Sequence, residues 1–93
     1  MAPTFIQFEK VVQNEKGLHA RASAKLVSLV EAYDANCTIG ANGKTVPGDS
    51  IMGILMLAAA KGCRIKVRIW GKERSLLEKA IIQLIDGRFD EKN

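Results

Sequence analysis

Apolar and polar residues alternate along four stretches of the chain, and this alternation predicts four β-strands. The clearest stretch is 63–70, where apolar residues occupy every second position and Arg64, Lys66 and Arg68 lie between them. Such a strand has one buried and one solvated face. The other predicted strands span residues 5–12, 35–40 and 44–46. Lys10 interrupts the apolar face of the first strand, so the register of that strand stays open.

Three further stretches have the apolar spacing of amphipathic helices. In residues 20–32, small or apolar side chains recur at intervals of three and four, which places them on one helical face. These inward positions are Ser23, Leu26, Val27 and Val30. A helix over residues 72–85 is predicted in the same way, from an inner stripe of Leu77, Ala80, Ile81 and Leu84. Between them, residues 51–60 predict a short, very apolar helix that stops at Lys61-Gly62.

The order of these elements defines the expected fold. Asn42-Gly43 lies between two short strands and predicts a tight hairpin, because both residues accept positive φ. The order is β-α-β-β-α-β-α, and one layer of helices must cover the apolar face of the strands. We therefore expect a single α+β domain over residues 1–93: an open-faced β-sandwich whose four-stranded antiparallel sheet is covered on one face by three helices. Residues 90–93 are expected to form a polar tail.

Composition and charge narrow the location and the partners. Hydrophobic residues make up 47% of the chain and charged residues 26%, as in ordinary globular domains. No apolar run approaches the roughly 18 residues of a membrane span. The N-terminal residues 1–4 lack the pattern of a signal peptide. We expect a cytoplasmic protein without membrane insertion. Its net charge of +4 suits an acidic protein, a nucleic acid or an anionic metabolite equally.

The cysteines and the histidine do not form a metal site in the sequence. Cys37 and Cys63 each lie in a strand-like alternation, and there is no Cys-x-x-Cys motif. One histidine cannot complete a zinc site with them. We interpret both cysteines as small buried residues with free thiols. Neither a metal nor a cofactor is expected.

The only histidine, His19, precedes the first predicted helix. A neutral imidazole can act as a nucleophile near pH 7. The backbone N–H groups at a helix start, that of Ala20 included, favour a bound phosphate and disfavour a protonated imidazole. Arg21 can pair with phosphate oxygens, and Gly17 allows a close approach of the loop. This arrangement predicts a phosphohistidine site. The alternative is a surface histidine that lies beside an arginine by chance, because His-x-Arg is a short motif.

A second candidate region begins at Ser50. Ser50 is a good N-cap for the short apolar helix, and it could equally accept a phosphate that repels an acidic partner. The helix behind it has more apolar surface than one core face requires. Two readings stay open: its apolar residues are core, or some of them form an exposed docking patch. The apolar residues concerned are Ile51, Met52, Leu55 and Met56.

The basic residues of the clearest strand have two interpretations as well. Arg64, Lys66 and Arg68 are most simply the solvated face of the sheet. A small nucleic-acid-binding domain would need interleaved aromatic residues for base stacking, and Trp70 stands alone at the strand end. We therefore expect no nucleic-acid partner.

Three linked motifs resemble one known family. Residues 14–23 (NEKGLHARAS), 49–54 (DSIMGI) and 60–62 (AKG) resemble HPr, the histidine-containing phosphocarrier protein of the bacterial phosphoenolpyruvate-dependent phosphotransferase system. The resemblance covers nearly the whole chain. It implies the fold expected above and a phosphoryl-transfer intermediate, not a stand-alone enzyme.

The resemblance also implies roles for particular residues and partners. His19 would receive a phosphoryl group from Enzyme I at Nδ1 and pass it to an EIIA-type protein, with Arg21 beside it. Ser50 matches a serine that an HPr kinase/phosphorylase modifies in some bacteria. The apolar docking patch matches Ile51, Met52 and Leu55. We expect a monomer. An alternative is a regulatory binding module that acts through Ser50 and its apolar helix.

Two features depart from the common pattern of this family. Ala22 replaces the usual proline after the arginine, so the helix start is expected to be slightly less rigid. The segments 34–35, 55–57 and 87–91 resemble the nitrogen-related branch, whereas residues 50–53 resemble the serine-regulated branch. The sequence leaves open whether the pathway is sugar uptake or nitrogen regulation.

Overall fold

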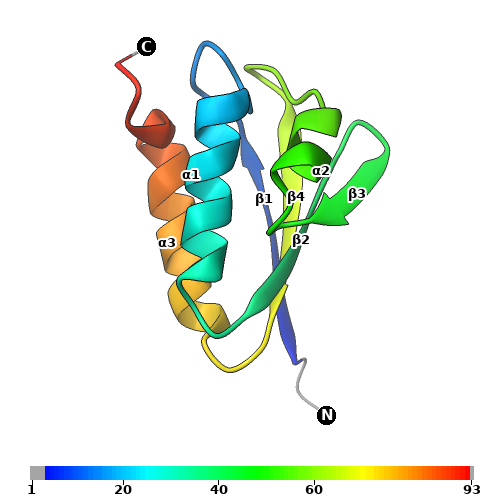
Figure 1. Cartoon of the computed structure of the whole chain (residues 1–93), viewed down its shortest axis with the longest axis vertical. Helices are drawn as coiled ribbons and strands as arrows, with labels where there is room; N and C mark the ends of the chain where they lie inside the picture. The colour runs from blue at the N-terminus through cyan, green and yellow to red at the C-terminus, as the bar shows by residue number, and fades with distance from the viewer. Residues whose placement is uncertain (1–3, 93) are drawn as a thin grey trace.

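Four strands form one antiparallel sheet in the order β1-β4-β2-β3 in the computed structural model of the chain, which describes residues 4–92. The three helices cover one face of this sheet and leave the other open (Figure 1). This confirms the predicted fold class. The strands are β1 (Phe5–Val11), β2 (Asn36–Ala41), β3 (Lys44–Pro47) and β4 (Arg64–Trp70). The helices are α1 (Ala20–Glu31), α2 (Ile51–Met56) and α3 (Arg74–Asp86), and a short turn, η1 (Arg88–Asp90), follows them.

The core lies between the sheet and the helices. β4 is central, and its Ile65, Val67 and Ile69 are fully buried, while the basic residues between them are exposed. The predicted inner stripe of α1 is buried. In α3 the fully buried residues are Leu77, Ile81 and Ile85, whereas the predicted Ala80 and Leu84 are half-buried. Burial of these apolar side chains is the main force that holds the helices on the sheet.

The register of β1 is set by its antiparallel pairing with β4, in which Phe8 lies opposite Val67. Lys10 lies on the half-buried face of this strand, and its ammonium pairs with Asp86 of α3 at 2.6 Å. A lysine is tolerated there because its aliphatic stem packs on the core edge while its charged end reaches a carboxylate.

Asn42 and Gly43 form the predicted hairpin turn, with φ of 52° and 79°. The Asn42 side chain has a second task that the sequence did not indicate. Its Nδ2 donates to the carbonyl of Leu57 at 2.8 Å and satisfies an orphan carbonyl at the end of α2.

The predicted C-terminus of the short helix was wrong. Helix α2 ends at Met56, not at residue 60, and Ala58 has a φ of 52°, which no α-helix contains. Lys61-Gly62 lies in a separate turn, where the N–H of Gly62 donates to the carbonyl of Val12 at 2.8 Å. The reason is tertiary, because the segment between α2 and this turn pairs with the loop before α1.

Two other expectations need correction. Residues 90–92 are not a free polar tail, because η1 turns the chain back and Phe89 is fully buried. Cys37 is buried as predicted, but Cys63 precedes β4 and is half-exposed. Both thiols are free. The expectation for the N-terminal segment falls on residues 1–3, which lie outside the described residues, as does Asn93. Within residues 4–92, none of the helices has the length and hydropathy to cross a membrane.

Candidate functional site

His19 is the N-cap residue of α1. Its backbone is extended, with φ of −77° and ψ of −176°, and its side chain makes no capping hydrogen bond. The carbonyl of His19 accepts the first helical bond from the N–H of Ser23 at 2.8 Å. Helix geometry leaves the N–H groups of Ala20, Arg21 and Ala22 without intrahelical acceptors. The imidazole therefore lies beside a helix start whose donors it does not occupy.

The loop that carries His19 is docked on the chain that follows α2. The N–H of Leu18 donates to the carbonyl of Ala59 at 2.9 Å. Gly17 has a φ of 64°, and a Cβ there would lie 2.4 Å from the same carbonyl oxygen. Only glycine meets both conditions, the left-handed backbone and the close approach. The close approach expected at Gly17 is therefore an approach to the backbone of Ala59.

Two buried polar side chains hold the same loop from inside. Ser23 Oγ donates to the carbonyl of Leu18 at 3.1 Å. Asn14 is fully buried, and its Nδ2 donates to the carbonyl of Gly17 at 2.8 Å. Buried polar groups of this kind stabilise one conformation, because an alternative would leave them without partners. The backbone just before His19 is therefore well defined.

Glu91 reaches the imidazole from the end of the chain. One of its carboxylate oxygens, Oε2, contacts Nε2 of His19, and the other, Oε1, accepts from Asn14 Nδ2 at 3.0 Å. The hydrogen bond with His19 lowers the pKa of Glu91, partial burial opposes this shift, and the bond from Asn14 adds to the lowering. Figure 1 shows the C-terminal segment at the same end of the molecule as the start of α1.

The sequence does not indicate a role for Glu91, because the polar stretch 90–93 predicts only a tail. The available signal was Phe89, an aromatic residue in an otherwise polar stretch.

The candidate site is a depression of about 640 Å³ that is lined by positively and negatively charged side chains. Arg21 is exposed on the first turn of α1 and shares this depression with His19. No carboxylate pairs with Arg21 or Lys16 within the part of the chain that the structure describes. Both cations therefore stay available to an anion. The lining residues are Glu15, Lys16, His19, Ala20, Arg21, Asp90, Glu91 and Lys92.

Ser50 caps α2 in the way that its sequence position predicted. Its Oγ accepts from the N–H of Gly53 at 2.9 Å. Ser50 is half-buried, and its hydroxyl oxygen already accepts this capping hydrogen bond. Ser50 is therefore the N-cap of α2, as predicted, whereas its phosphorylation stays a prediction.

The apolar residues of α2 divide between core and surface. Ile54 is fully buried, whereas Ile51, Met52 and Met56 are 40%, 70% and 62% exposed. Leu55 is half-buried. One part of this helix is therefore core and another part is exposed surface, and a docking role for the exposed part stays a prediction. Ile51, Met52, Leu55 and Met56 are called the α2 patch below.

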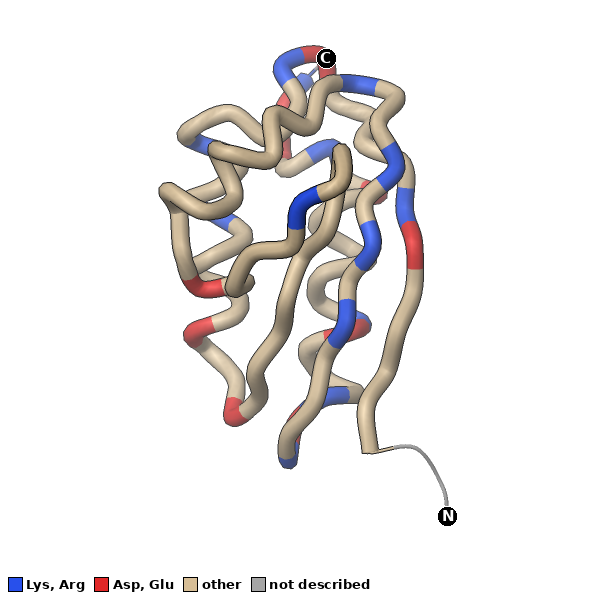
Figure 2. The backbone as a smooth tube through the Cα atoms, turned by 90° about the vertical axis from the view of Figure 1, so that its right-hand side faces the viewer, with Lys and Arg blue, Asp and Glu red and all other residues tan. Residues whose placement is uncertain are grey.

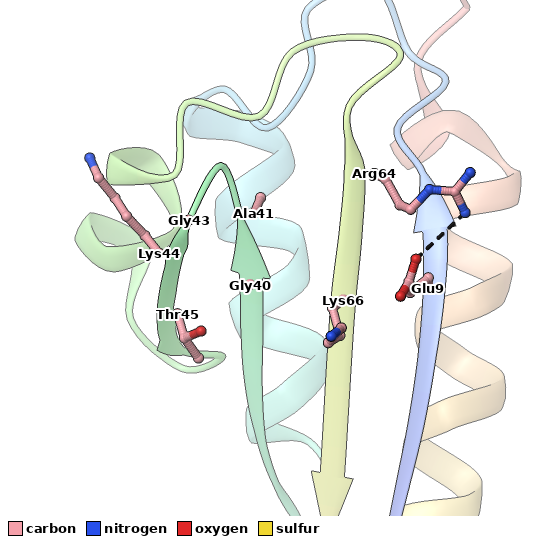
Figure 3. Close-up of a pocket in the computed structure, with 8 residues that line it drawn as sticks. All are labelled: Glu9, Gly40, Ala41, Gly43, Lys44, Thr45, Arg64 and Lys66. Atoms are coloured by element: carbon pink, nitrogen blue, oxygen red, sulfur yellow. Dashed lines mark ion pairs between the residues drawn. The ribbon is translucent and has the colours of Figure 1, made fainter.

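The open face of the sheet is basic along β4, as Figure 2 shows. A cavity of about 450 Å³ lies on this face, between the β2–β3 hairpin and the end of β1. Figure 3 shows the residues that line it. Arg64 pairs with Glu9 at 3.6 Å, and Arg68 donates to Gln7 Oε1 at 2.9 Å. Two of the three basic side chains, those of Arg64 and Arg68, therefore already have partners on the neighbouring strand.

Trp70 is not alone on this face, because antiparallel pairing places Phe5 opposite it. The guanidinium of Arg68 lies 5.0 Å above the Phe5 ring. Both rings lie at one end of the face, so they are not interleaved with the basic residues as base stacking along a strand would require.

The residues that could ligate a metal do not meet. Within residues 4–92 no group of three His, Cys, Asp or Glu side chains could hold a metal ion.

The fold and this site define the chain as a small open-faced α+β protein built around a histidine at a helix start. The family described as "PTS HPr component phosphorylation site" matches residues 6–86. The chain belongs to this family, the HPr phosphocarriers of the phosphotransferase system.

Individual relatives agree with this assignment. The phosphocarrier protein HPr of Xylella fastidiosa (strain 9a5c) is 41% identical over 92% of this chain and 97% of its own. The phosphocarrier protein NPr of Shewanella violacea is 35% identical over 95% of this chain and 97% of its own. The crystal structure of an HPr from Thermoanaerobacter tengcongensis superposes with a TM-score of 0.89 at 28% identity, covering 95% of this chain and 99% of that one.

Proposed function

We propose that His19 accepts a phosphoryl group at Nδ1 from phosphorylated Enzyme I and passes it to an EIIA-type protein. The observation that carries this proposal is the open start of α1 beside the imidazole. His19 is the N-cap residue, yet its side chain satisfies none of the helix N–H groups. An anion on the imidazole would meet those donors and the positive end of the helix dipole. Membership of the HPr family supports the same role.

The transfer requires only groups that the site already has. The Nδ1 lone pair attacks phosphorus, a P–N bond forms, and the bond to the donor breaks with its electron pair returning to the donor. The phosphoryl oxygens then accept hydrogen bonds from backbone N–H groups at the start of α1, including that of Ala20, and charge-assisted bonds from Arg21. The second transfer reverses these steps toward the EIIA-type protein.

The α2 patch is the proposed docking surface for both partners. Met52 is the most exposed residue of the patch at 70%, and a methionine adapts to more than one partner because its side chain is flexible. The segment that follows α2 lies against the loop that carries His19, because the carbonyl of Ala59 accepts from the N–H of Leu18. A protein docked on Ile51, Met52 and Leu55 would therefore reach toward His19.

The test is a phosphorylation reaction followed by intact-mass measurement. The protein is incubated with phosphoenolpyruvate and Enzyme I, and one phosphoryl adduct is expected that is labile in acid and stable in alkali. His19→Ala should give no adduct. Arg21→Gln should form it at least about tenfold more slowly, because a charge-assisted bond is lost. Lys79→Gln, an exposed lysine of α3, is the matched control and should react at the wild-type rate. An adduct on His19→Ala would refute the proposal.

A second function is supported by the position of Ser50. It caps α2 directly beside the α2 patch, so a phosphate on its hydroxyl would place negative charge at the proposed docking surface. We propose that an HPr kinase/phosphorylase modifies it where that enzyme is present. An acid-stable adduct formed with this kinase and ATP, and absent in Ser50→Ala, would support regulation. Full cellular function of His19→Ala would show that regulation, not transfer, is the main role.

The pathway is decided by the acceptor. Relatives named HPr and NPr both match this chain, so sugar-specific and nitrogen-related EIIA proteins are both candidates. Transfer from the phosphorylated protein to each purified EIIA type, measured as a rate, distinguishes the two. We propose that the carrier acts as a cytoplasmic monomer, in keeping with the resemblance to its family.

A further inference from the structure

The end of the chain folds back onto the candidate site and brings a carboxylate to the imidazole. We propose that Glu91 is a positioning residue that holds His19 in the tautomer with hydrogen on Nε2 and the lone pair on Nδ1. This inference rests on the proposed phosphoryl transfer and adds a residue to it. The juxtaposition joins residues 72 positions apart, so it is a property of the folded protein alone.

The carboxylate of Glu91 has a fixed orientation. Asn14, fully buried, donates to Oε1 at 3.0 Å, and this leaves Oε2 directed at Nε2 of His19. The Glu91 side chain is 12% exposed and that of His19 is 27% exposed. The contact is therefore partly shielded from water, and a fully exposed ion pair would contribute little.

The backbone before Glu91 is held in an uncommon conformation. Arg88, Phe89 and Asp90 have φ of 57°, 55° and 62°, a left-handed turn made without glycine. Such a turn persists only where the surrounding structure determines it. Here Phe89 is fully buried, and Lys25 of α1 donates to the carbonyl of Phe89 at 2.8 Å. These contacts direct residue 91 toward the start of α1.

The tautomer follows from the acceptor character of the carboxylate. An ionised carboxylate only accepts hydrogen bonds, so Nε2 must carry the hydrogen. In the neutral ring Nδ1 then has the lone pair that attacks phosphorus. After transfer Nε2 keeps its hydrogen, the phosphorylated ring becomes positive, and the Glu91 carboxylate faces that charge. No further acid, base or co-reactant is required.

An isosteric substitution tests this directly. In Glu91→Gln the side chain has the same shape, and Asn14 still donates to its Oε1. The amide nitrogen of the glutamine then faces Nε2 of His19 and donates to it, which moves the ring hydrogen to Nδ1. Imidazole 15N resonances of the unphosphorylated protein near pH 8 should show mainly Nε2–H in wild type and mainly Nδ1–H in Glu91→Gln.

The rate of transfer is the second measurement. With Enzyme I and phosphoenolpyruvate, Glu91→Gln should accept the phosphoryl group about tenfold more slowly or worse, as for other residues that orient a functional histidine. Glu31→Gln is the matched control, because it makes the same change from glutamate to glutamine at an exposed position at the other end of α1, away from the candidate site. Glu31→Gln should keep the wild-type tautomer and a rate within twofold.

The possible outcomes separate the two proposals. A Glu91→Gln protein that keeps Nε2–H and a rate within twofold of wild type overturns the role of Glu91. Equal losses in Glu91→Gln and Glu31→Gln would also overturn it, because they indicate a general charge effect. If wild type itself accepts no phosphoryl group, the proposed transfer fails, whereas the tautomer measurement still reports whether Glu91 orients the ring. Thermal unfolding of each variant shows whether a loss reflects misfolding.

Discussion

Two helix starts in this small protein are built in opposite ways. At the start of α2, Ser50 Oγ accepts the N–H of Gly53, so the helix satisfies its own donor within three residues. At the start of α1, His19 occupies the same N-cap position but leaves the helix donors free. The imidazole is instead held by Glu91, from the far end of the chain.

The difference shows how a helix start becomes available to an external anion. A capped start offers a phosphate fewer donors, because the capping side chain already accepts from one N–H group. An uncapped start offers its donors, but its loop then needs support from elsewhere. At α1 that support is tertiary: Gly17 packs on the loop after α2, and Glu91 comes from beyond α3. At α2 it is local.

The largest effect is expected at the residue that anchors the C-terminal segment. Phe89 is fully buried, so Phe89→Ala should lower the free energy of unfolding by about 4 kcal/mol. Phe5→Ala is the control, because Phe5 is 42% exposed, and it should cost about 1 kcal/mol. Urea denaturation measures both. Similar costs for the two variants would show that the C-terminal turn is not held by burial of Phe89.

Gly17→Ala tests the docking of the His19 loop. The new methyl group would overlap the carbonyl of Ala59 and require a φ of 64°, so a loss of about 3 kcal/mol is expected from strain and crowding together. Gly43→Ala has a similar φ of 79° with nothing near its Cβ, and strain alone should cost about 1 kcal/mol. Equal losses in denaturation experiments would contradict the close approach at Gly17.

Ser50→Ala tests the local cap of α2. Loss of the hydrogen bond to the N–H of Gly53 should lower the free energy of unfolding by about 1 kcal/mol. Ser50→Asp keeps an acceptor at the same place and should stay near the wild-type stability. If Ser50→Ala unfolds at the same urea concentration as wild type, the contrast between the two helix starts is smaller than the hydrogen bonds indicate.

The smallest effect is the pH dependence of the Glu91 contact. The hydrogen bond with His19 holds the pKa of Glu91 below its ordinary value of 4.5, so folding favours the ionised carboxylate. The contact therefore contributes stability above about pH 4.5 and loses it as the pH falls through the lowered pKa. The stability difference between wild type and Glu91→Gln should narrow between pH 6 and pH 3. A difference that grows on acidification would contradict this sign.

Much of the fold was predictable because local patterns agreed with the tertiary structure. The alternation in β4 and the stripe of α1 each indicate which face is buried, and burial decides the arrangement of sheet and helices. The end of α2 was not predictable in this way. Ala58 leaves the helix because the following carbonyl, that of Ala59, accepts from Leu18 in the loop before α1, and no local propensity reports such a partner.

Local sequence alone places a lone histidine before a helix, with glycine before it and arginine after it, because these are neighbours along the chain. It also determined which side chains face the core, since side-chain direction follows the helical and strand periods. Which ring nitrogen of His19 makes a contact is settled by the folding of the chain. That choice depends on Glu91, which reaches the imidazole after the burial of Phe89 turns the chain back, and contacts between distant residues leave no period in a sequence.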